Sequence, residues 1–168
     1  LRYVLTANAP ETKDNDFTWE EFQSRNNNEL LAIYGNFINR VIVLTHKYYS
    51  GKVPKCDKLK KEDLEVLSQM ELIPKKIGNC IENFRFREAS QLLMQLARIG
   101  NKYLADTEPW KLIKIDPERV KEIIYTALQI VVGLSIISEP ILPYTSKKLK
   151  KILNLDSSHF SWNDIGKK

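Results

Sequence analysis

The apolar residues of this chain recur at intervals of three and four, a spacing that places them on one face of an α-helix. Four such stretches are long, at residues 26–49, 62–84, 86–107 and 117–137, and a shorter basic one covers 145–153. No run of any length alternates apolar and polar residues as a half-buried strand does. The pattern predicts an all-α protein, an antiparallel helical bundle of about five helices.

Residues that start and interrupt helices refine these boundaries. Segments 18–21 and 26–29 each place a Thr or Asn three residues before a Glu, as in a capping box, so a helix start is expected at both. Asp116 before Pro117 marks the start of the most apolar helix. Pro74 lies inside its helical stretch and should kink or split it, because proline lacks a backbone donor and its ring clashes with the preceding turn.

The stretch 120–137 is apolar almost all round, a property shared by membrane spans and by central helices of soluble bundles. Polar or small residues interrupt it, and charged residues flank it closely. The interruptions are Thr126, Gln129, Gly133, Ser135 and Ser138. We therefore expect a central helix buried by its neighbours.

Composition places the chain among ordinary globular proteins. It has 168 residues, 43% of them hydrophobic and 28% charged, with a net charge of +5. This mild basic bias suggests a polyanionic partner, although interspersed surface charge explains most of it. Cys56 and Cys80 form no disulfide framework and no metal-ligand motif, so we expect a reduced, cytoplasmic protein without a metal site.

One predicted helix carries polar groups where a buried cylinder is expected. Residues 31–44 are strongly apolar, yet Asn36, Asn39 and Arg40 fall within about a quarter-turn of one another. Amide and guanidinium groups in such a place cost free energy unless they find partners. Either they cap a neighbouring element inside the bundle, or they project from its surface to hold a ligand.

A second candidate lies at the end of a later helix, where segment 101–110 finishes with Pro109 and Trp110. Proline stiffens the approach to the indole, which could cover the end of the bundle as a core residue or stack on an unpaired base. Asn and Arg groups beside an exposed aromatic can read base edges in single-stranded RNA. Trp and Arg are also common anchors of protein interfaces, so a helical docking module with no RNA specificity is the alternative.

Catalytic motifs are absent from the sequence. It has no P-loop, no glycine-rich dinucleotide turn, no nucleophile elbow and no HExxH. We expect that this chain alone catalyses nothing, and we assign no catalytic residue.

Five segments carry a resemblance to a known family. They are L-R-Y-V-L-T-A-N-A-P-E (1–11), N-F-I-N-R (36–40), F-R-E-A (86–89), N-K-Y-L-A-D-T-E-P-W (101–110) and S-E-P-I-L-P (138–143). In this order they resemble the C-terminal anticodon-binding helical domain of methionyl-tRNA synthetases, which are class I aminoacyl-tRNA synthetases. The resemblance implies that residues 1–15 are the end of the catalytic part and a connector, and that residues 16–168 are the helical bundle.

The resemblance also implies roles for three residues. Asn36, Arg40 and Trp110 match the family positions that recognise the CAU anticodon, chiefly its first base, cytosine. Some members have a further Asn one turn earlier, where this chain has Ala32. Asn39 is a possible supporting residue, for which we expect a role inside the bundle. The pairing of N-x-x-x-R with Pro-Trp argues against a synthetase for another amino acid.

The partners and cofactors follow from the same resemblance. The expected partners are the methionine-accepting tRNA and, within the same polypeptide, a catalytic domain that holds ATP and, in some members, zinc; no cofactor is expected in this part of the protein, and no membrane partner. Asn101 and Pro109 are possible supporting or loop contacts to the RNA. Lysines in segments 52–61 and 147–151 would add salt-dependent attraction to its backbone.

Overall fold

The computed structural model describes residues 1–11, 14–155, 162 and 165, and these contain helices but no strand. This confirms the predicted all-α fold. The helices are α1 (Arg2–Ala7), α2 (Trp19–Arg25), the π-helix η1 (Asn26–Gly35), α3 (Asn36–Tyr49), α4 (Lys61–Glu82), α5 (Phe86–Thr107), α6 (Pro109–Leu112), α7 (Pro117–Ile137) and α8 (Pro143–Ile152).

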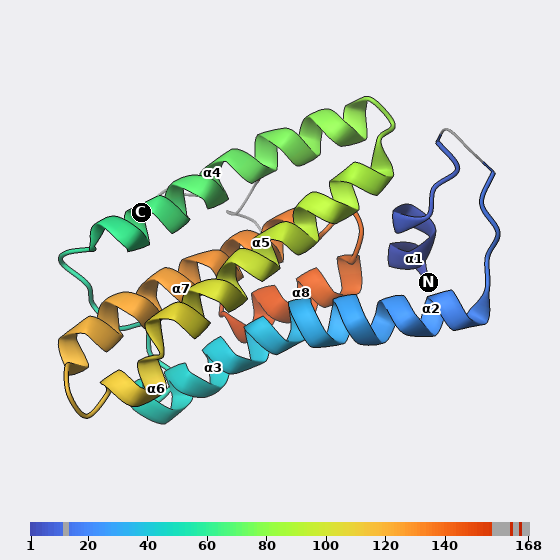
Figure 1. Ribbon diagram of the computed structural model, residues 1–168. Helices are drawn as coiled ribbons and strands as arrows, with labels where there is room; N and C mark the ends of the chain where they lie inside the picture. Colours follow the sequence, from blue (N-terminus) through green and yellow to red (C-terminus); the bar gives the residue numbers. More distant parts are fainter. Residues whose placement is uncertain (12–13, 156–161, 163–164, 166–168) are drawn as a thin grey trace.

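Three of these elements form one long rod. Helix α2, η1 and α3 follow each other without a break along one edge of the molecule (Figure 1). Helices α4 and α5 form an antiparallel pair across from the rod, and α7 packs against α3, α4, α5 and α8. Short α1 packs on α5 near the start of the rod, whereas α6 lies near its other end. Different short helices therefore lie near the two ends of the rod.

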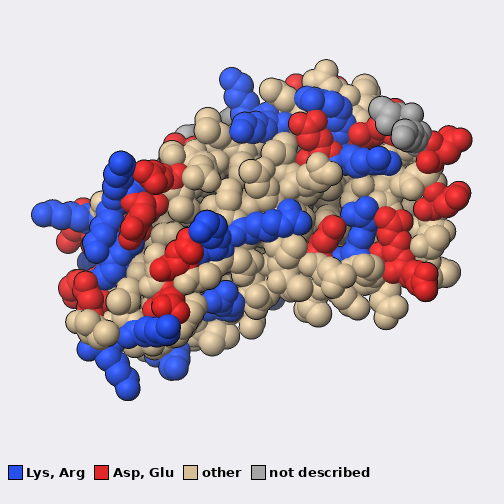
Figure 2. Space-filling model, in the orientation of Figure 1, with Lys and Arg blue, Asp and Glu red and all other residues tan. Residues whose placement is uncertain are grey.

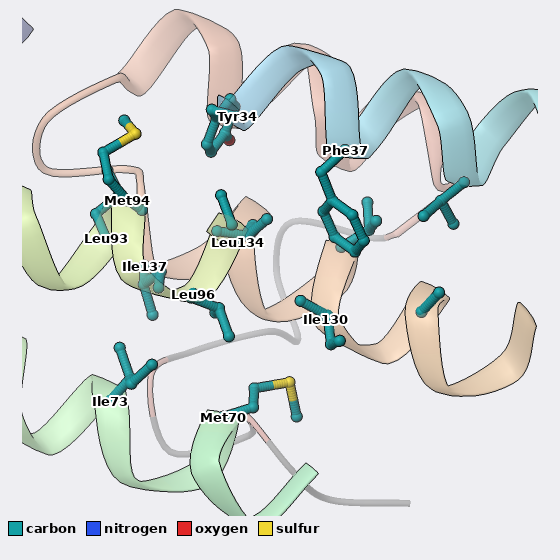
Figure 3. Packing of buried hydrophobic residues seen from close by; sticks show 14 of the residues in the cluster. Tyr34, Phe37, Met70, Ile73, Leu93, Met94, Leu96, Ile130, Leu134 and Ile137 are labelled. Carbon is teal, nitrogen blue, oxygen red and sulfur yellow. The ribbon is translucent and has the colours of Figure 1, made fainter. Parts of the chain in front are cut away.

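The core is built around α7. Side chains from the rod, α4 and α5 meet those of α7 in one cluster (Figure 3). Its labelled members are Tyr34, Phe37, Met70, Ile73, Leu93, Met94, Leu96, Ile130, Leu134 and Ile137. Helix α7 is long and apolar enough to cross a membrane, but 72% of its apolar window is buried inside the bundle. The burial favours the central-helix interpretation over a membrane span.

The expected helix start at segment 26–29 is wrong. Asn26 has helical backbone angles (φ −61°, ψ −44°), whereas an N-cap residue is normally extended. Its side-chain amide donates to the Phe22 carbonyl oxygen at 2.7 Å, which ties it to the turn before. The start at Thr18 is confirmed, because the Thr18 hydroxyl accepts from the Glu21 backbone N–H at 3.1 Å. The helix therefore begins eight residues earlier and continues through a π-helical segment.

Two other helix signals had different outcomes. Pro74 is buried inside α4, which continues through it as one helix and is not split. Asp116 caps α7, since its carboxylate accepts from the Arg119 backbone N–H at 3.0 Å. The predicted start of the central helix is thus confirmed.

Candidate nucleic-acid interface

The polar stripe of the rod lies at the side of its buried face. Phe37, Val41 and Leu44 of α3 are buried, whereas Asn36 is exposed and Arg40 is half-buried. Asn39 is exposed, which differs from the internal role expected for it. It follows Phe37 by two residues, so its side chain points roughly 200° away from that buried ring and toward solvent.

Trp110 is directed outward by an unusual turn. Helix α5 ends at Thr107, and its C-cap residue Glu108 has left-handed backbone angles (φ 42°, ψ 56°), a conformation that costs a non-glycine residue about 1–3 kcal/mol. The Glu108 carbonyl oxygen accepts from the Lys111 backbone N–H at 2.8 Å, and its carboxylate pairs with the Lys111 ammonium at 2.7 Å. Pro109 is buried, and Trp110 is 38% exposed. The indole is therefore a surface group and no core residue.

The structure brings Arg40 and Trp110 together from distant parts of the sequence. The guanidinium carbon of Arg40 lies over the indole, 5.0 Å from its ring centroid, as in a cation–π pair. Asn36 is exposed one helical turn earlier on the same side of the rod. The structure thus pairs a guanidinium of α3 with the indole of α6, and the exposed Asn36 amide lies on the rod one turn before Arg40.

Close packing between the rod and α5 fixes this arrangement. Gly100 of α5 lies against the ring of Phe37, and a Cβ at Gly100 would stand only 2.4 Å from its Cζ atom. The Asn101 amide nitrogen donates to the Ile33 carbonyl oxygen at 2.9 Å and to the Ala97 carbonyl oxygen at 3.0 Å. Asn101 is therefore a tie between α5 and the π-helical segment that precedes Asn36.

A buried ionic network, which the sequence interpretation missed, supports α5 from its other side. The Arg119 guanidinium donates to both oxygens of Asp63, and the Tyr103 hydroxyl donates to Asp63 at 2.6 Å. Burial acts to raise the pKa of Asp63, but these hydrogen bonds outweigh it and hold the pKa below its ordinary value. Burial also raises the pKa of Tyr103, so its hydroxyl stays a neutral donor. One sequence signal could have revealed the network, since Asp63 is an acid on the apolar face of α4.

The side chains of this arrangement supply binding groups. Within the described ranges, no three His, Cys, Asp or Glu side chains are close enough to hold a metal ion. The indole offers a stacking surface, Arg40 offers a planar set of donors, and Asn36 both donates and accepts. These are the groups that hold an unpaired base.

Comparisons with known sequences point to one family. A family model described as the anticodon binding domain of methionyl tRNA ligase matches residues 53–168. A second, described as tRNA synthetases class I (M), matches residues 1–42. The methionine–tRNA ligase of Christiangramia forsetii is 63% identical over all of this chain, and that of Phocaeicola vulgatus is 57% identical over 99% of it. The chain spans only 25% and 24% of these two curated relatives.

Solved structures share the same fold. Free methionyl-tRNA synthetase of Mycobacterium tuberculosis superposes with a TM-score of 0.92 at 20% identity, covering 99% of this chain and 34% of that protein. The same enzyme with methionyl-adenylate gives a TM-score of 0.93. Together with the sequence matches, these findings show that the chain belongs to the family of anticodon-binding domains of methionyl-tRNA ligases.

Proposed function

We propose that this chain recognises the CAU anticodon of methionine-accepting tRNA, as the RNA-binding part of a methionine–tRNA ligase. Family membership supports this role for the domain, and the pairing of Arg40 with the exposed Trp110 supports the location of the site. The whole enzyme would attach methionine to that tRNA with ATP. The pairing of Arg40 with Trp110 is the observation on which the assignment of residues depends.

Each side chain has a distinct role in this proposal. Trp110 stacks on the first anticodon base, cytosine, and keeps the loop splayed open. Arg40 donates to the cytosine carbonyl and ring nitrogen or to a neighbouring phosphate. Asn36 matches the remaining edge of the base, since its amide both donates and accepts. Pro109 and Asn101 contribute indirectly. Pro109 fixes the turn that carries Trp110, and Asn101 fixes the rod against α5.

The remaining parts of the proposal concern the rest of the enzyme. ATP, methionine and any zinc belong to a catalytic domain of the same polypeptide, and this chain acts by fixing the position of the tRNA. We also propose a cytoplasmic location. The free thiols Cys56 and Cys80, one half-buried and one buried, support a reducing compartment.

Substitution of the indole tests the proposal. Trp110→Ala should weaken binding of a CAU stem-loop by about 1–3 kcal/mol, roughly 5- to 150-fold, because a stacking surface is lost. Fluorescence anisotropy with a labelled stem-loop measures this, and a panel of other triplets measures the preference for CAU. Trp19→Ala is the matched control, since Trp19 is 74% exposed at the opposite end of the rod.

The contrary outcomes are equally clear. Unchanged affinity of Trp110→Ala, with helical content intact by circular dichroism, would remove Trp110 from the site. Wild-type binding that is indifferent to the triplet would favour a protein docking module instead.

A further inference from the structure

A recess of about 860 Å³ lies between α1, α2 and α5, at the end of the molecule opposite α6. Its wall is mainly polar, with the amides of Asn8, Asn15, Gln91 and Gln95 among the lining groups. Three arginines also line it, Arg25, Arg87 and Arg98. A recess of this size and polarity, away from the Trp110 end, has no role in the function proposed so far.

The carboxylates of this recess are already engaged. Glu21 and Glu29 pair with Arg25 at 3.1 and 3.3 Å, and Glu29 also accepts a hydrogen bond from the Tyr3 hydroxyl. Glu88 pairs with Arg85 at 2.9 Å. Each acid of the wall thus has a partner, although Glu21 and Glu29 share Arg25, which these contacts occupy.

Two arginines of α5 differ from Arg25 in their contacts. Neither Arg87 nor Arg98 forms an ion pair with any residue that the structure describes, and the buried Nε–H of Arg87 has no hydrogen-bond acceptor there. A buried donor without a partner is unfavourable, so such groups in folded proteins usually meet an acceptor from a ligand or water. Since guanidinium groups bind phosphate through paired N–H donors, a phosphate is the ligand that fits.

These arginines belong to a continuous stripe. Arg87, Gln91, Gln95, Arg98 and Lys102 follow at spacings of four, four, three and four, which places them on one face of α5. The stripe runs roughly 22 Å along the helix and leads from the recess toward the Trp110 end. In Figure 2, lysine and arginine side chains lie across the middle of this face, over α5, with aspartate and glutamate side chains beside them. Lys102 already pairs with Asp106 at 2.6 Å, so the donors left for a ligand run from Arg87 to Arg98, and they fit neighbouring phosphates of one strand.

We propose that Arg87 and Arg98, with Gln91 and Gln95 between them, bind the phosphate backbone of an RNA stem whose loop occupies the Asn36–Arg40–Trp110 site. This inference rests on the proposed function, because the loop site sets where the stem begins. The stripe reads no sequence: it fixes the angle of the stem along α5 while Trp110 and its neighbours select the triplet.

The experiment separates these two contributions. Binding of methionine-accepting tRNA by the double variant Arg87→Gln/Arg98→Gln is titrated at several salt concentrations. The slope of log K against log salt should fall in magnitude by about 2, because each lost phosphate contact removes about 0.9. The ratio of affinities for CAU and non-CAU triplets should not change. Trp110→Ala should do the opposite, lowering the ratio and leaving the slope.

Three control variants separate the position of the charge from its loss. Lys75→Gln/Lys76→Gln removes the same two charges from exposed positions on α4 and should leave the slope nearly unchanged. Arg87→Lys/Arg98→Lys keeps both charges and should restore most of the wild-type slope. Gln91→Glu/Gln95→Glu tests the stripe at exposed positions that do not threaten the fold, and it should weaken all triplets equally.

Two results would overturn the inference. One is a slope for Arg87→Gln/Arg98→Gln that equals the slope of the wild type or of Lys75→Gln/Lys76→Gln, while the preference for CAU is intact. That result would leave the proposed function unaffected. The other is a loss of triplet preference in that double variant, which would mean that the arginines act on the loop site. A wild-type chain that binds no tRNA would instead refute the proposed function itself.

Discussion

At the scale of single residues, the most consequential side chain outside the candidate site is Asp63. It is fully buried in α4, where the pattern of apolar residues predicts a hydrophobic side chain, and Leu64 beside it is 49% exposed. Arg119 explains why Asp63 and not Leu64 is buried, because a buried guanidinium requires a buried carboxylate to compensate its charge. The partner of Asp63 lies 56 residues away, so spacing along the chain could not reveal the pair.

Removing this carboxylate should destabilise the bundle strongly. Asp63→Asn removes the fully buried carboxylate that pairs with Arg119 and leaves the more exposed Glu62 and Glu122 as its partners. Breaking a buried pair in this way typically costs about 3–5 kcal/mol. Urea unfolding monitored by circular dichroism measures the change. Glu62→Gln is the control, since Glu62 also pairs with Arg119 but is 58% exposed, and pairs of that kind contribute about 1 kcal/mol or less. A loss of equal size in both variants would contradict this account.

Acid titration tests the same carboxylate. Since the folded-state pKa of Asp63 is held below its ordinary value, its contribution is fully present above the ordinary carboxyl pKa, about 3.9. The contribution is lost as the pH falls through the lower folded-state value. The free energy of unfolding should therefore drop less between pH 5 and pH 2 in Asp63→Asn than in the wild type. Parallel pH profiles of the two proteins would exclude Asp63 as a source of acid sensitivity.

At the scale of elements, the rod and α5 place the candidate site together. The sequence predicts both helices and the stripe that carries Asn36 and Arg40, because apolar periodicity is a local property. It does not predict the π-helical register of η1, which involves the tie from Asn101 on α5 to the Ile33 carbonyl oxygen. The contact between Arg40 and Trp110 is likewise tertiary, and only the family resemblance anticipated it.

Gly100 is where the rod and α5 approach most closely, and a methyl group there should separate them. In Gly100→Ala the new Cβ would stand 2.4 Å from the Phe37 ring, so overpacking should cost about 1–3 kcal/mol despite the better helix propensity of alanine. CAU stem-loop binding should weaken too, because Arg40 shifts relative to Trp110. Thermal unfolding and anisotropy measure the two effects.

Gly78→Ala provides the matched comparison within α4. The nearest atom to its new Cβ is Cζ3 of Trp162 at 4.0 Å, an ordinary contact. This variant should be as stable as the wild type or up to about 1 kcal/mol more stable, with RNA binding unchanged. Equal destabilisation by both substitutions would show that Phe37 does not set the distance between the rod and α5.

At the scale of the whole molecule, one core serves both ends of the rod. Helix α7 packs against α3, α4, α5 and α8, and the buried residues form one cluster from Tyr3 to Leu149. Sequence analysis predicts this arrangement well, since a helix that is apolar all round must be covered on every side. It predicts the recess between α1, α2 and α5 poorly, because polar residues on one face of α5 look like ordinary solvated surface.

A single core predicts that the bundle unfolds as one unit. Far-ultraviolet circular dichroism reports all the helices, whereas tryptophan fluorescence reports the surroundings of three side chains, Trp19 in α2, Trp110 in α6 and Trp162. Helices α2 and α6 lie near opposite ends of the rod. In urea the two signals should show the same midpoint. Ile130→Ala, a truncation at a fully buried position of α7, should lower both midpoints together and cost about 2–5 kcal/mol. Separate midpoints, or a shift in only one signal, would mean that the two ends of the rod unfold independently, and the stem and loop contacts proposed for them would then lack a rigid connection.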